Sequence, residues 1–145
     1  MSSVLAGLNP EQARAAAHVD GPLLVLAGAG SGKTRVLTHR IAHLLEQGVE
    51  PWQILAVTFT NKAAGEMKER VVGLVGDRGQ RIFVSTFHSA CSRFLRQDIE
   101  ALGYGRSFSI YDTDDQRRLM RQLMNEQGVD RKNWSPNKII SRIDS

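Results

Sequence analysis

The sequence predicts an α/β fold in which a parallel sheet is flanked by helices. Short apolar runs at residues 23–27, 54–58 and 81–86 have the length and composition of buried strands. Each run is followed by a longer segment whose apolar residues recur at helical spacing. Strand and helix signals that alternate in this order are typical of parallel βα units. With 41% hydrophobic and 23% charged residues, the 145-residue chain has the composition of an ordinary globular protein.

A helix is expected before the first of these strands. Asn9 has the side chain of an N-cap, Pro10 suits the first helical position, and Gln12 can close a capping box. The Gln12 amide also carries a donor and an acceptor, which is the pairing that fits the N6/N7 edge of adenine. The sequence leaves both interpretations of Gln12 open.

A glycine-rich loop connects the first predicted strand to the next helix. It consists of Ala27, Gly28, Ala29, Gly30, Ser31, Gly32, Lys33 and Thr34. Its glycines allow backbone N–H groups to converge on phosphate oxygens, and the helix that follows adds the positive end of its dipole. Lys33 can neutralise the β- and γ-phosphates, and Thr34 can bind Mg²⁺. The general pattern begins with glycine where this chain has Ala27, and the Ser-Gly-Lys-Thr end is intact. The loop predicts a nucleotide-binding site.

Two further strand–helix units follow. A helix ending at Gly48 leads to the strand at 54–58, a helix ending at Gly76 leads to the strand at 81–86, and a last helix ends near Gly103. The carboxyl ends of parallel strands lie at one edge of a sheet, where ligands bind. We therefore expect the loops after all three strands to be neighbours.

The second and third strand-end loops place hydroxyl groups around an aromatic ring. Their candidate contact residues are Thr58, Phe59, Thr60, Asn61 and Lys62 in one loop and Thr86, Phe87 and His88 in the other. Such donors suit phosphate oxygens, and a loop phenylalanine can stack on an unpaired base, so the loops predict contact with a single-stranded nucleic acid. Other interpretations stay open: Thr60 can cap one helix and Ser85 or Thr86 the next, Phe59 and Phe87 can plug the core, and His88 can be a polar residue at a helix start.

The character of the chain changes after these units. Residues 1–108 are expected to form the nucleotide-binding domain, and residues 109–145 to begin a helical subdomain. Two amphipathic helices are predicted there, the second one opened by Ser135. Because the sequence ends within a helical pattern, it is expected to be an N-terminal piece of a longer protein.

Charge and cysteine content set limits on the class of protein. The net charge of +4 permits a nucleic-acid partner without establishing one. Cys91 is the only cysteine, so no internal disulfide can form, and its place in an apolar helical stripe predicts that it is buried. No apolar run is long enough to span a bilayer, and no secretory signal is recognisable at the N-terminus. A cytoplasmic location is expected.

Four stretches of the sequence occur together in a distinctive order. They are Leu8–Gln12, AGAGSGKTR at 27–35, AVTFTNKAA at 56–64 and STFHS at 85–89. In wording, order and spacing they resemble the superfamily-one DNA helicases of the UvrD/Rep/PcrA group. The stretch 110–116 also resembles the segment that leads into the inserted helical subdomain of that family. The resemblance implies a RecA-like phosphate-loop domain, followed by the start of that subdomain.

The resemblance also implies roles for individual residues. Gln12 would contact adenine, Gly28–Thr34 would hold the phosphates and Mg²⁺, and Arg35 would lie near the base. Lys33 and Thr34 would take part in ATP hydrolysis, Lys33 by stabilising charge on the γ-phosphoryl group. The two strand-end loops would touch single-stranded DNA, along which the whole protein would move 3′ to 5′ as an ATP-dependent helicase.

One motif of that family is not found in this sequence. It is an Asp-Glu pair after an apolar strand, which holds Mg²⁺ and orients the attacking water. Asp112 follows the only candidate segment, and a helix N-cap is its better interpretation. Because positioning and electrostatics supply nearly all of the catalysis of phosphoryl transfer, we expect this chain to bind ATP and DNA, to hydrolyse ATP poorly and not to unwind DNA. The alternatives are a piece of a helicase–nuclease subunit and a short ATP- or DNA-binding module that does not translocate.

Overall fold

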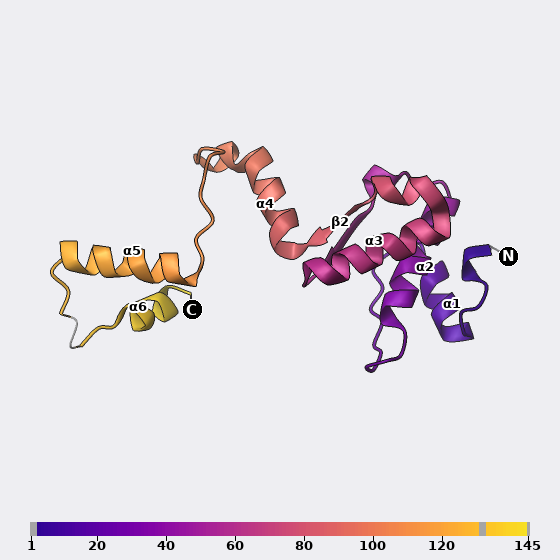
Figure 1. Cartoon of the computed structure of the whole chain (residues 1–145), viewed down its shortest axis with the longest axis horizontal. Helices are drawn as coiled ribbons and strands as arrows, with labels where there is room; N and C mark the ends of the chain where they lie inside the picture. The colour runs from indigo at the N-terminus through magenta and orange to yellow at the C-terminus, as the bar shows by residue number, and fades with distance from the viewer. Residues whose placement is uncertain (1–2, 131–132, 145) are drawn as a thin grey trace. The chain divides into compact units, whose positions relative to one another are not determined.

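The computed structural model describes residues 3–130 and 133–144, which divide into two compact units between Leu95 and Arg96 (Figure 1). The first unit contains the 3₁₀-helices η1 (Ser3–Leu5), η2 (Pro51–Gln53) and η3 (Gly76–Arg81), the α-helices α1 (Pro10–Ala17), α2 (Lys33–Glu46), α3 (Asn61–Val75) and most of α4 (Phe87–Asp98), and the strands β1 (Leu55–Thr58) and β2 (Phe83–Thr86). The second unit contains η4 (Ile99–Leu102), α5 (Thr113–Glu126) and α6 (Pro136–Ile143). The domain boundary after residue 108 stays a prediction.

The sheet of the first unit is parallel, as predicted. β1 and β2 pair in register, with Leu55 opposite Phe83 and Thr58 opposite Thr86, so α3 is the crossover between them. α2 packs between α1 and α3 (Figure 1). The apolar faces of α2 and α3 and the residues that lead into the two strands form the core, which consists of Ile41, Leu45, Ile54, Met67, Val71 and Ile82.

Side-chain caps determine where several helices begin. Asn9 Oδ1 accepts a hydrogen bond from the backbone N–H of Gln12 at 2.8 Å, as predicted. Thr60 Oγ1 accepts one from the N–H of Ala63 at 3.1 Å, so Thr60 is the N-cap of α3. Asp112 caps α5, which confirms the preferred interpretation of that residue. Each cap gives a partner to an N–H group that the first helical turn leaves unpaired.

Lys68 joins α3 to the chain that leads into β2. Its Nζ donates hydrogen bonds to the carbonyl oxygens of Gln80 at 2.7 Å and Ile82 at 2.6 Å. Burial lowers the pKa of Lys68 below its ordinary value. Gly79 lies so close to α3 that a Cβ there would come within 3.0 Å of the backbone of Val72. The lysine thus fixes the turn that aligns β2 with β1.

The prediction of a strand at residues 23–27 is wrong for this structure. The segment has no regular secondary structure, and the sheet formed by the described residues contains β1 and β2 alone. Leu24 and Leu26 are 81% and 86% exposed. A strand is held by ladder hydrogen bonds to a neighbour, and no described segment supplies them here. The prediction from composition was therefore wrong in both strand formation and burial, because a strand also requires a pairing partner.

The prediction that Cys91 is buried is also wrong, because Cys91 is exposed on α4. Its apolar stripe is open as well: Phe94 and Leu95 are 44% and 42% exposed. Phe94 makes an edge-on contact with the ring of Phe83, at 6.2 Å between centroids. Helical spacing predicted the helix, but burial depends on an element that packs against the stripe.

The second unit is built on two amphipathic helices, as predicted. α5 and α6 pack against each other, and Arg117 Nε donates a hydrogen bond to Asn137 Oδ1 at 3.0 Å. Between them, residues 131–132 lie outside the described residues. Within the described ranges, none of the helices has the length and hydrophobicity needed to cross a membrane.

Candidate functional site

The glycine-rich loop enters α2 through two left-handed residues. Gly30 has φ +75° and Gly32, the N-cap of α2, has φ +84°. Residues with a side chain rarely adopt this backbone conformation, so the loop depends on glycine at both positions. Lys33 and Thr34 follow in the first turn of α2, where unpaired N–H groups and the helix dipole attract anions.

The side chains of the loop bond to its own backbone. Lys33 Nζ donates to the carbonyl oxygens of Ala27 at 3.0 Å and Gly28 at 2.7 Å. Ser31 Oγ also donates to the carbonyl of Gly28, at 2.6 Å. The charge of Lys33 therefore lies inside the loop, held by groups that a stronger acceptor can replace.

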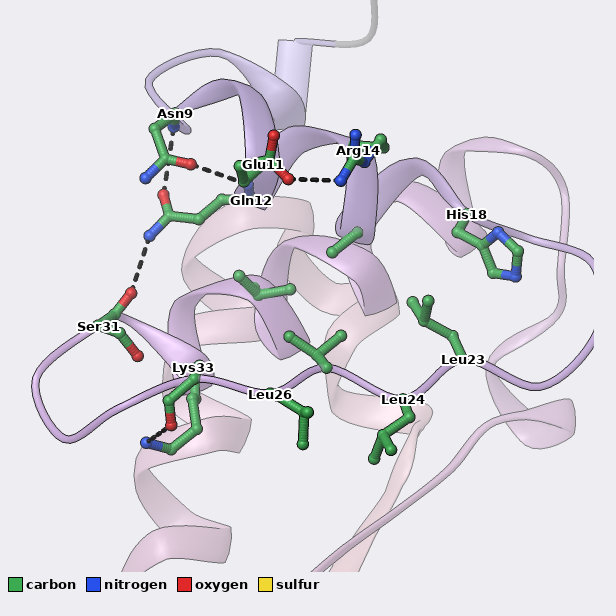
Figure 2. A pocket seen from close by; sticks show the side chains of 14 residues that line it. Asn9, Glu11, Gln12, Arg14, His18, Leu23, Leu24, Leu26, Ser31 and Lys33 are labelled. Atoms are coloured by element: carbon green, nitrogen blue, oxygen red, sulfur yellow. Dashed lines mark hydrogen bonds and ion pairs between the residues drawn. The ribbon is translucent and has the colours of Figure 1, made fainter.

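Gln12 bonds at both ends of its amide (Figure 2). Oε1 accepts from the backbone N–H of Asn9 at 3.2 Å, which completes the capping box of α1. Nε2 donates to the carbonyl oxygen of Ser31 at 3.1 Å, and so ties α1 to the glycine-rich loop. The capping interpretation of Gln12 is confirmed. Because an amide offers two N–H donors and two lone pairs, one donor and one acceptor remain for another partner.

A cavity of about 530 Å³ lies between α1, the loop and residues 23–27. Figure 2 shows Gln12, Ser31 and Lys33 around one end of it and Leu23 and His18 around the other. Its lining residues are Asn9, Glu11, Gln12, Arg14, Ala15, His18, Leu23, Leu24, Val25, Leu26, Ala27, Ser31, Lys33 and Val36. The cavity thus joins an apolar wall to polar groups of α1 and the loop, as ligand sites commonly do.

Two lining residues of this cavity, Arg14 and His18, were not predicted. Arg14 lies on α1 and His18 is its C-cap, and their spacing of four residues places them on one side of the helix. Arg14 also pairs with Glu11 at 2.5 Å, and both side chains are largely exposed. The helical spacing was the available signal, but only the fold shows that these residues line the cavity.

Arg35 does not line the cavity beside the loop. Its Nη2 donates to the carbonyl of Gly7 at 3.0 Å. It lines a separate hollow of about 350 Å³ between α2 and α3, whose other residues are Thr38, His39, Arg70, Gly73 and Leu74. The structure therefore does not bring Arg35 together with Lys33.

The loops after β1 and β2 lie side by side, as predicted. The ring centroids of Phe59 and Phe87 are 5.4 Å apart. Phe59 is 89% exposed, so the interpretation of its ring as a plug of the core is wrong. Phe87 is half-exposed and supports the other ring from one side. The strand that was predicted to carry the glycine-rich loop to this edge does not form.

The threonine hydroxyls at these strand ends have local partners. Thr58 Oγ1 donates to the carbonyl of Thr60 at 3.0 Å, and Thr60 in turn caps α3. Thr86 Oγ1 accepts from the N–H of Ser89 at 3.2 Å in the first turn of α4. The capping interpretation of Thr60 and Thr86 is thus confirmed. The predicted contact residues that are exposed are Phe59, Thr60, Asn61, Lys62, Phe87 and His88, whereas Thr58 and Thr86 are buried.

Acidic metal ligands are not gathered anywhere in the described ranges. No group of three His, Cys, Asp or Glu residues within residues 3–130 and 133–144 could hold a metal ion. Asp112 uses Oδ1 to accept from the N–H groups of Asp114 at 2.9 Å and Asp115 at 2.8 Å. Thr34, the residue predicted to bind Mg²⁺, is exposed at the start of α2.

Comparison with known proteins identifies the sequences that this chain is similar to. Residues 8–145 match the family described as UvrD/REP helicase N-terminal domain. The chain is 54% identical over 145 residues to the ATP-dependent DNA helicase PcrA of Bacillus subtilis (strain 168). It is 51% identical over 144 residues to the ATP-dependent DNA helicase PcrA of Staphylococcus aureus (strain Mu50 / ATCC 700699). Each match covers 99% of this chain and 20% of the relative, so the chain spans a fifth of the length of these proteins.

Proposed function

The chain belongs to the UvrD/REP helicase N-terminal domain family, and from this premise we propose that it is the ATP-binding motor part of an ATP-dependent DNA helicase. The proposal includes a RecA-like arrangement of the sheet in the whole protein and movement 3′ to 5′ along single-stranded DNA. The observation that carries it is the glycine-rich loop, which enters α2 through Gly32 and places Lys33 in the first helical turn.

ATP is the substrate proposed for the cavity beside this loop. The amides of residues 28–34 and the amine of Lys33 would bind the phosphates, which replace the carbonyl oxygens of Ala27 and Gly28 as partners of Nζ. The remaining donor and acceptor of Gln12 would read the adenine edge. Arg35 would lie near the base only after its bond to Gly7 is broken.

Mg²⁺ fits the donor chemistry of Thr34, whose hydroxyl stands at the exposed start of α2. When bound with ATP, the ion would neutralise charge on the phosphates. Asp112 is committed to capping α5 and does not supply an acidic ligand. We therefore propose that this chain binds ATP but hydrolyses it poorly.

Single-stranded DNA is the partner proposed for the paired strand ends. The exposed rings of Phe59 and Phe87 offer a surface on which bases stack. The N-termini of α3 and α4 begin directly beside these rings, and their N–H groups suit phosphate oxygens. Asn61, Lys62 and His88 are exposed around the rings and would contact the strand.

The ATP site is tested with a fluorescent ATP analogue and Mg²⁺, titrated with this chain. Lys33→Ala removes the charge that the phosphates need, and we expect it to weaken binding at least about 100-fold. Lys62→Ala is the matched control, because it removes a lysine from the proposed DNA surface, and its affinity for the analogue should stay within about two-fold. Unchanged binding by the Lys33 variant would sink the assignment of the loop.

A further inference from the structure

We propose that Gln12 is a positioning residue for the phosphate loop, acting through the carbonyl of Ser31, in addition to any contact with adenine. The inference rests on the proposed function, because it concerns the same ATP site. Its basis is the hydrogen bond from Gln12 Nε2 to the Ser31 carbonyl at 3.1 Å, between residues 19 positions apart in the sequence.

The capping box orients the Gln12 amide before the loop contacts it. The backbone N–H of Gln12 donates to Asn9 Oδ1 at 2.8 Å, and the backbone N–H of Asn9 donates to Gln12 Oε1 at 3.2 Å. With Oε1 held at the end of α1, the amide plane presents Nε2 to the loop (Figure 2). Helix α1 thus serves as a fixed support for the donor.

The acceptor of this bond controls the direction of a loop N–H. The carbonyl of Ser31 and the N–H of Gly32 belong to one planar trans peptide unit, in which they point in opposite directions. Because Gln12 holds the carbonyl toward α1, the N–H of Gly32 is directed away from α1. N–H groups at a helix N-terminus are the donors that bind phosphate oxygens, so Gln12 sets the orientation of one of them.

Close packing supports the same role. A Cβ at Gly32 would come within 2.8 Å of Gln12 Nε2, so the amide lies directly against the loop backbone. Gly32 also has φ +84° and is the N-cap of α2 without a side-chain cap bond of its own. The contact with Gln12 therefore stabilises a left-handed turn at the point where the loop becomes helix.

The test uses a ligand that has phosphates and no base. Binding of inorganic tripolyphosphate and of ATP, both with Mg²⁺, is measured by titration calorimetry. Gln12→Met keeps the length of the side chain and removes the donor. Gln12→Glu also removes the donor but keeps the acceptor for Asn9, because glutamate closes capping boxes at this position. Gln53→Met is the control: Gln53 Oε1 closes another capping box by accepting from the backbone N–H of Glu50 at 3.0 Å, and Gln53 does not line the cavity.

We expect both Gln12 variants to bind tripolyphosphate about three- to five-fold more weakly than the unsubstituted chain, the effect of one lost hydrogen bond. Gln53→Met should stay within about two-fold, because it removes the same amide from a capping box outside the cavity. Full-strength tripolyphosphate binding by Gln12→Met, with ATP binding weakened, would show that Gln12 reads only the base and would overturn the inference. Weakening by Gln12→Glu alone would be a charge effect and would overturn it as well.

A separate outcome concerns the proposed function. If the unsubstituted chain bound neither ATP nor tripolyphosphate, the ATP site itself would be wrong, and the inference would fall with it. Binding of both ligands by the unsubstituted chain, with no difference among the variants, would contradict only the role of Gln12.

Discussion

The ring of Phe59 is exposed to solvent, which is unfavourable for an apolar side chain and suggests a function for it. Apolar rings normally gain free energy by burial, and this one is 89% exposed while its neighbour Phe87 covers only one side. A base stacked on the open face would remove that surface from water. The ring is therefore the residue whose loss should affect DNA binding most directly.

We predict that Phe59→Ala weakens the binding of a labelled single-stranded oligonucleotide about ten-fold, because stacking contributes on the order of 1–3 kcal/mol per base. Fluorescence anisotropy measures the affinity. Trp52→Ala is the control, since Trp52 is a 70% exposed aromatic residue that precedes β1 at its opposite end. Equal losses in both variants would contradict a specific stacking role for Phe59, and ATP binding should be unaffected in either.

At the residue scale, the sequence predicted local bonds better than distant ones. The caps at Asn9, Thr60 and Asp112 follow from side chains within three positions of the N–H groups they pair with. The bond between Gln12 and Ser31 could not be predicted in the same way. It spans 19 positions and depends on how α1 packs against α2, which is a property of the tertiary structure.

At the scale of elements, Lys68 is the side chain that sets how α3 meets β2. We predict that Lys68→Met lowers the free energy of unfolding by about 1–2 kcal/mol, because two carbonyl oxygens lose their donor. Chemical denaturation monitored by circular dichroism measures the change. Arg70→Met is the control on the same helix, since Arg70 makes only a long, exposed ion pair with Glu66 at 3.9 Å and should change stability by less than about 0.5 kcal/mol.

The difference in stability between the unsubstituted chain and Lys68→Met should depend on pH. Burial lowers the pKa of Lys68 in the folded chain, so the unfolded chain binds this proton more tightly. Stability then rises with pH between the lowered pKa and the ordinary value of 10.5. The unsubstituted chain should therefore gain stability relative to Lys68→Met as the pH rises through that interval, and a relative loss would contradict the assignment.

Elements whose pairing or packing partner lies within the described residues were predicted well. Elements whose partner is not among them were not. β1 and β2 pair with each other, and every described α-helix begins within a few residues of its predicted start. Residues 23–27 have equally good strand composition but no pairing strand among the described residues. The stripe at Cys91 and Phe94 failed in the same way, because burial is a relation between two surfaces.

At the scale of the whole molecule, the relatives are the guide, because this chain spans 20% of their length. We predict that a chain extended beyond Ser145 to the length of these relatives pairs residues 23–27 with a further strand. Hydrogen exchange at the amides of Leu24 and Leu26 should then slow by at least about 100-fold relative to this chain, because a central strand opens rarely. The amides of Phe59 and Thr60, in the loop after β1, serve as an internal reference.

The extended chain should also show ATP turnover that single-stranded DNA stimulates, whereas this chain alone should not. The physical reason is that hydrolysis needs groups beyond Lys33 and Thr34 to orient the attacking water. Strong DNA-stimulated turnover by the 145-residue chain would contradict this division. Slow exchange at Leu24 and Leu26 in the short chain would contradict the proposed pairing.

The position of the Lys33 amine has a consequence for the choice of anion. An incoming ion has to displace the carbonyls of Ala27 and Gly28 from the ammonium before it gains anything from the charge. A single monovalent ion such as chloride does not compensate for the loss of these two hydrogen bonds. A polyphosphate brings several oxygens at once and can replace both. The loop would thus bind monovalent anions weakly and polyphosphates strongly.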